Sequence, residues 1–185
     1  YNTATGQGAM QGNTTGAYNT AVGASALISN TTASNNTAVG YQAGYNNTTG
    51  ATNAVMIGTQ AGYFITGGTH NIAIGYQALQ SLLTGSNNLA IGNAAGNHGA
   101  LTSAQNCVIV GGNNGATLAG LTGSILISDG AGNIRIQSDG NGLVTVPGTL
   151  TSTGLLTVNS NIKFPATQIA SSDANTLDDY EEGTF

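Results

Sequence analysis

The side chains that could carry out catalysis or bind a metal are few in this chain and stand far apart. Its 185 residues include two histidines, His70 and His98, and one cysteine, Cys107. Both histidines lie in turn-rich stretches without an acid nearby, so neither has the partner that acid–base catalysis needs. A single cysteine permits no disulfide within the chain and no cysteine-based metal site. We therefore expect no catalytic residue, no cofactor and no metal ligand among them.

The acidic residues do not form a catalytic pair either. Glycoside hydrolysis requires two carboxyl groups about 5–10 Å apart across a groove that holds the sugar. Five of the seven acids fall in the last thirteen residues, a stretch typical of a solvated connector: Asp173, Asp178, Asp179, Glu181 and Glu182. The other two, Asp129 and Asp139, begin Asp-Gly turns that could offer oxygen ligands to Ca²⁺, although plain turn chemistry explains them as well. The sequence predicts that the protein is not an enzyme.

Charged side chains are absent from the first 128 residues. Arg135 and Lys163 are the only basic residues, so no basic stripe is available to a phosphate backbone and we expect no nucleic-acid partner. No apolar run approaches the roughly 18 residues of a membrane span, so we expect no membrane insertion. Such a neutral polar composition would also fit a disordered chain.

A repeated phrase argues against disorder and controls the fold prediction. The phrase is Asn-x-Ala-Val/Ile-Gly-x-x-Ala, and it begins at Asn19, Asn36, Asn71 and Asn88. Its glycine recurs every 17 to 19 residues, at Gly6, Gly23, Gly40, Gly58, Gly75, Gly92 and Gly111. A fixed period of this length indicates a solenoid in which each repeat is one coil and the glycine marks its turn. We predict an all-β, parallel β-roll of about eight coils of about 17 residues over residues 1–128.

The residues before each glycine alternate with a period of two, as strand residues do. We expect the β-branched pair of each coil to point into its interior and to form the structural core, and Asn, Ala and Gly to point outward. The core set is Val22, Val39, Ile57, Ile72, Ile74, Leu89, Ile91, Val108, Val110, Ile125 and Ile127. Such a core is thin, and the flat Ala/Gly face would let subunits approach closely, so we expect a homo-oligomer.

The pattern changes after Ser128. Residues 129–170 contain short alternating stretches broken by Gly and Pro, which favour a fibrous β shaft, and residues 171–185 read as an extended connector. The chain starts without Met and stops abruptly at Phe185, so we expect a segment cut from a longer protein.

The repeat phrase is similar to the head repeat of trimeric autotransporter adhesins, written Asn-Ser-Val-Ala-Ile-Gly-x-x-Ser. In the coil of Asn71, Ile72 takes the motif's Val place, Ile74 its Ile place and Ala78 its Ser place. The resemblance implies a left-handed parallel β-roll assembled as a homotrimer. The chain departs from the motif in its longer coils and in Met56 and Ile109 at the small position.

The C-terminal residues carry a second resemblance. Residues 173–185, Asp-Ala-Asn-Thr-Leu-Asp-Asp-Tyr-Glu-Glu-Gly-Thr-Phe, look like a junction common in bacteriophage tail fibres, and residues 144–150 are similar to the shafts of such fibres. This implies a virion location, other virion tail proteins as partners, and a host cell-surface receptor that could be a glycan. The expected function is a trimeric rod that spaces and presents a receptor-binding tip.

Two other functions were weighed against that of a virion fibre. The head of a bacterial surface adhesin, located at the bacterial cell surface, stays open as the alternative. An ice-binding solenoid would need long aligned Thr-x-Thr ranks, and only Thr3/Thr5 supplies one before the ranks turn aliphatic. Tyr41, Tyr63 and Tyr76 could stack on sugars, or could pack between subunits.

Overall fold

The computed structural model describes residues 1–97, 102–112, 122–131, 133–139 and 141–147. The expected connector and most of the expected shaft lie outside these residues, as does His98. Ten strands and no helix occur in the described part of the chain. No helix in that part is therefore long or apolar enough to cross a membrane.

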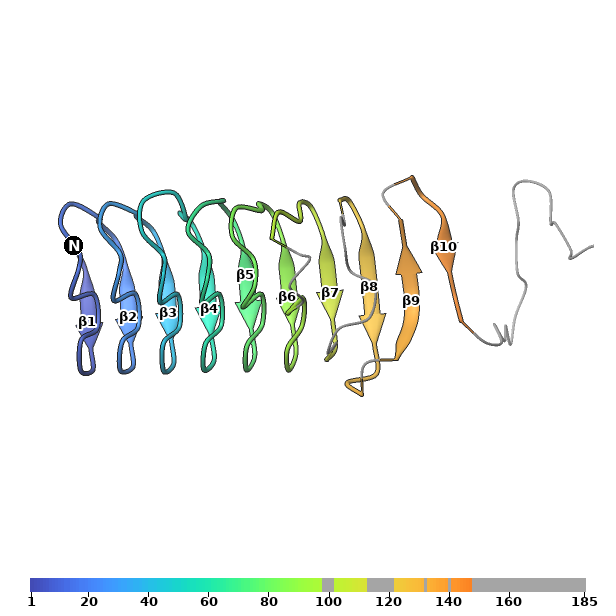
Figure 1. Ribbon diagram of the computed structural model, residues 1–185, viewed down its shortest axis with the longest axis horizontal. Coiled ribbons are helices and arrows are strands. Elements are labelled where there is room, and N and C mark those ends of the chain that lie inside the picture. Colours follow the sequence, from blue (N-terminus) through green and yellow to red (C-terminus); the bar gives the residue numbers. More distant parts are fainter. Residues whose placement is uncertain (98–101, 113–121, 132, 140, 148–185) are drawn as a thin grey trace, which may run out of the picture. The chain divides into compact units, whose positions relative to one another are not determined.

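Eight short strands stack in chain order as neighbouring rungs of one parallel sheet (Figure 1). They are β1 (Thr3–Thr5), β2 (Thr20–Val22), β3 (Thr37–Val39), β4 (Val55–Ile57), β5 (Ile72–Ile74), β6 (Leu89–Ile91), β7 (Val108–Val110) and β8 (Ile125–Ser128). The register never slips: Ala21 pairs with Ala38, Ala73 with Ala90, and Ile109 with Leu126. Equal coil lengths bring equivalent residues side by side, which confirms the predicted β-solenoid.

The expectation about which strand face points inward was wrong. The central residue of each strand from β2 to β8 is at most 1% exposed, whereas its two neighbours are exposed or half-buried. Six predicted core residues are exposed: Val22, Ile57, Ile91, Val110, Ile125 and Ile127. The other five are half-buried: Val39, Ile72, Ile74, Leu89 and Val108. A period of two separates two faces of a strand but does not tell which one is inside.

The coil interior is too narrow for two β-branched columns, and its packing shows this directly. Met56 takes the place that Ala occupies in the neighbouring strands, and glycine faces it on both sides. A Cβ at Gly44 or Gly62 would lie 2.8–2.9 Å from the Met56 side chain. In coils with an alanine at the strand centre, a buried Leu27 or Leu79 stands where these glycines do. Large and small residues thus alternate to keep the interior filled.

Asparagine satisfies the buried backbone inside the roll. Asn36 is 1% exposed; its backbone N–H donates to the Asn19 side chain at 2.9 Å, and its own side-chain oxygen accepts from the Ala54 N–H at 2.9 Å. Its side-chain nitrogen donates to the Ala51 carbonyl at 2.9 Å. Asn71 and Asn88 are bonded in the same way further along. The Asn of the repeat phrase is therefore an internal bracket between coils, not an outward residue.

The repeat glycines lie where the chain leaves each strand. All seven have positive φ, between 98° and 137°. A Cβ at Gly58 would lie 2.5 Å from the carbonyl oxygen of Gly75 in the next coil. These turns therefore need glycine both for its backbone conformation and for the close approach of the neighbouring coil.

Parallel stacking ends after β8. β9 (Ile134–Ser138) pairs antiparallel with β8, and β10 (Val144–Thr145) pairs antiparallel with β9. The change of pattern expected after Ser128 thus coincides with a change of strand direction, while the sheet continues into the same compact unit, which ends at Thr149.

Candidate functional site

The most extensive apolar surface is the outward face of the parallel strands, which we call the outer sheet face. It consists of the first and third residues of each strand, and these become aliphatic toward the C-terminal half of the roll. Ile91 is 39% exposed, Ile57 39% and Ile125 45%. No charged residue interrupts the face between β1 and β8. A continuous exposed aliphatic face of this kind marks an interaction surface more often than a solvent boundary.

The antiparallel strands continue this face. Ile136 of β9 pairs with Ile127 of β8, so both side chains lie on the same side of the sheet. Ile136 is 38% exposed and Val144 of β10 is 59% exposed. The outer sheet face therefore runs past the last parallel strand without a change of character.

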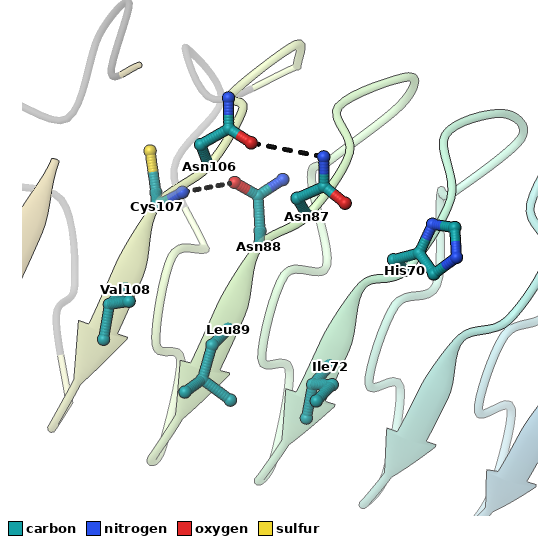
Figure 2. A pocket seen from close by; sticks show the side chains of 8 residues that line it. All are labelled: His70, Ile72, Asn87, Asn88, Leu89, Asn106, Cys107 and Val108. Carbon is teal, nitrogen blue, oxygen red and sulfur yellow. Dashed lines mark hydrogen bonds between the residues drawn. The ribbon is translucent and has the colours of Figure 1, made fainter. Parts of the chain in front are cut away.

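An open groove of about 390 Å³ borders the outer sheet face along β5 to β7. Figure 2 shows Ile72, Leu89 and Val108 on the strands, with His70, Asn87 and Asn106 standing on the turns before them. The Asn87 side chain donates to the Asn106 side chain at 3.2 Å. The groove holds no pair of titratable groups, so it offers shape and amide hydrogen bonds and not acid–base chemistry.

A second surface follows the strands and combines amides with aromatic rings; we call it the amide–aromatic surface. It is formed by Tyr41, Gln42, Tyr45, Gln60, Tyr63, Phe64, Gln77, Gln80 and Asn97. The Gln60 amide nitrogen donates to Gln42 at 2.9 Å, and the Gln60 oxygen accepts from both Gln77 and Gln80 at 3.0 Å. This column of amides crosses four successive coils, because Asn97 in turn donates to Gln80 at 3.1 Å.

Aromatic side chains lie beside the first amides of that column. The rings of Tyr45 and Tyr63 stack with centroids 4.8 Å apart and 9° between their planes, and Phe64 meets Tyr63 edge-on at 4.7 Å. Burial raises the pKa of Tyr63, and the neighbouring phenols of Tyr45 and Tyr41 raise it further. Tyr41, itself 52% exposed, therefore belongs to the same cluster.

The residues singled out for chemistry are kept apart by the fold. His70 is exposed, and its ring Nδ1 lies 2.9 Å from the Thr69 hydroxyl. Cys107 is 1% exposed and its thiol donates to the Gln105 carbonyl at 3.2 Å, as expected of a buried filler. Within the described residues, no three His, Cys, Asp or Glu side chains gather as metal ligands would.

The two described acids are turn residues. Asp129 accepts hydrogen bonds from the backbone of its own turn and from the side chain of Asn133, and it forms an ion pair with Arg135. The Asn133 amide and then the Arg135 guanidinium hold the pKa of this carboxyl well below its usual range. The Leu143 N–H similarly lowers the pKa of Asp139. Both carboxylates are thus occupied by their own turns.

Sequence reasoning missed the amide column, although a signal for it is present. Gln42, Gln60 and Gln77 each stand two residues after a repeat glycine, and equivalent positions of successive coils must lie side by side. No protein-family model, curated protein or solved structure matches the chain. The functional reading therefore depends on the surfaces described above.

Proposed function

We propose that the protein is a structural and adhesive rod, a segment of a virion tail fibre that works as a homotrimer. The observation that supports this is the outer sheet face, where aliphatic side chains form two columns along the strands and half or less of each side chain from β2 to β8 is covered. Water is a poor neighbour for such columns, and fully burying one Ile or Val is worth about 1.5–3 kcal/mol. A second copy of the chain fits the face well, since it is equally apolar and uncharged.

The face by which subunits meet differs from the one that the sequence suggested. The alanines are inside the coil, so the β-branched columns take over the role expected of the flat Ala/Gly face. Three copies, and not two, are proposed because the repeat phrase resembles that of trimeric adhesin heads. In that arrangement the three outer sheet faces meet around the fibre axis.

The fibre assignment rests on the resemblance of residues 144–150 and 173–185 to tail-fibre shafts and junctions. The partners in that setting are the chain itself, other virion tail proteins and a host cell-surface receptor. The mechanism is mechanical and multivalent: a stiff trimer holds its binding surfaces away from the particle, and several fibres together give avidity for repeated receptors. The head of a bacterial trimeric surface adhesin is the second candidate, and the repeat phrase favours it equally.

Two measurements test the proposal. Native mass spectrometry of the full chain should give about 55 kDa, three times the 18.3 kDa of one chain. A stable folded monomer would refute the assembly. Gold-labelled antibodies against the roll should then decorate virus particles from the source culture; labelling of the bacterial surface alone would replace the fibre with the adhesin.

A further inference from the structure

We propose that the amide–aromatic surface binds a neutral glycan, an inference that rests on the proposed adhesive role and gives its receptor a chemical class. The surface lies outside the strands, so the outer sheet face does not use it. Its centre is Tyr41, Gln42 and Gln60, with the Tyr45–Tyr63 stack beside them.

The first argument is the chemistry of the side chains. The C–H face of a sugar ring packs on an aromatic ring, and sugar hydroxyls both donate and accept hydrogen bonds, as side-chain amides and phenols do. The surface supplies both kinds of group next to each other. Among the described residues, the phenol hydroxyls of Tyr41, Tyr45 and Tyr63 form no hydrogen bond with another side chain, so they are available to a ligand.

The second argument is order. A glutamine loses up to about 2 kcal/mol of rotamer entropy when it is fixed, and this cost weakens binding if a ligand has to impose it. Here the Gln60 side chain is already held by three hydrogen bonds of 2.9–3.0 Å to Gln42, Gln77 and Gln80. The fold does not require glutamine in this column, because Ala94 occupies the same position of the next coil with nearly the same φ, 53° against 57° for Gln60. The column is thus ordered beyond what the coil needs.

The third argument is charge, and it selects the kind of glycan. No Lys or Arg occurs in the first 128 residues, so nothing there pairs with a carboxylate or phosphate on an acidic sugar, and no Asp or Glu attracts an amino sugar cation. A linear neutral glycan could follow the column, since equivalent residues recur along the roll about every 4.8 Å. We therefore assign the site to neutral polysaccharide chains.

Affinity electrophoresis of the full chain tests the assignment, with a soluble β-glucan, a mannan or a galactomannan cast in separate native gels. The net charge of −5 carries the protein into the gel. At least one of the three should retard the chain, and alginate, an anionic polysaccharide, should not. Retardation by alginate alone, or by none of the polysaccharides, would overturn the proposal.

Variants locate the site. Tyr41→Ala and Gln60→Ala should each weaken binding to the retarding polysaccharide about tenfold, which corresponds to the loss of one stacked ring or one fixed amide. Tyr18→Ala is the matched control, an exposed tyrosine that precedes its strand where Tyr41 follows one, and it should bind as the wild type does. Equal binding by all three variants would refute the location.

The mass of each variant separates this proposal from the trimer. A wild-type trimer that no polysaccharide retards would overturn the glycan site and leave the assembly intact, whereas a retarded monomer would do the reverse. Should Tyr41→Ala dissociate the trimer, Tyr41 is a subunit contact and the glycan site at this position is wrong.

Discussion

Two neighbouring residues, Ala90 and Ile91, allow a sharp test of the inside and the outside of the coil. Ala90 is the buried centre of β6, and Ile91 is 39% exposed on the outer sheet face. We expect Ala90→Asp to unfold the roll locally and Ile91→Asp to leave the single coil folded but prevent the chains from associating. The two substitutions introduce the same side chain one residue apart, so they differ only in the face they change.

The magnitudes follow from the burial of each position. At residue 90 an aspartate has no space and no partner in an interior filled by alanine, and an unpaired buried carboxylate costs several kcal/mol. At residue 91 two-fifths of an Ile side chain remains to be covered on association. Since full burial of Ile is worth about 1.5–3 kcal/mol, covering that share contributes about 0.6–1.2 kcal/mol per chain, or about 2–4 kcal/mol per trimer.

The milder Ile91→Ala variant should therefore lower the trimer association constant roughly 20- to 400-fold, and Ile91→Asp should lower it further because three carboxylates would meet near the axis. Sedimentation equilibrium measures the association, and circular dichroism with urea titration measures the fold. If Ile91→Asp stays trimeric, the outer sheet face is not the interface. If instead Ile91→Asp unfolds and Ala90→Asp does not, the inward and outward faces are reversed.

Four further outcomes can be checked on the same protein. The midpoint of thermal unfolding should stay constant or rise slightly between about 0.1 and 1 M NaCl, since the roll has no surface ion pairs to screen; a steep fall would point to charged contacts. Gly58→Ala should lower the free energy of unfolding by more than about 1 kcal/mol, while Gly67→Ala, whose Cβ would meet nothing closer than 3.7 Å, should have little effect. Asn36→Ala removes the acceptor of the buried Ala54 N–H and should cost about 1–3 kcal/mol by urea titration; an unchanged midpoint would contradict the bracket. Because its folded pKa is lowered, Asp129 should stabilise its turn at neutral pH and lose that effect as pH falls through the folded pKa; turn amide exchange should show this in the wild type and not in Asp129→Asn.

Much of the fold could be predicted from the sequence because the information is periodic. The repeat glycines fix the coil length, and the coil length alone forces equivalent residues into one parallel register. Gly58 and Gly75 illustrate this: their spacing of 17 residues in the sequence becomes direct neighbourhood in the roll, with positive φ at both. The scarcity of chemistry was likewise visible, since His70 and Cys107 have no partners in the sequence or in the fold.

The tertiary structure decided which side of each strand is inside. Alternation places Ala90 and Ile91 on opposite faces, but only the width of the coil determines that the small residue is enclosed and the large one is left outside. Hydrophobicity suggested the reverse, because it ranks isoleucine above alanine as a core residue without regard to space. The sequence by itself therefore determined the coil, its register and its neutrality, and the tertiary structure decided the direction of the side chains, the Met56–glycine compensation and the amide column, because these depend on the volume left between coils and not on order along the chain.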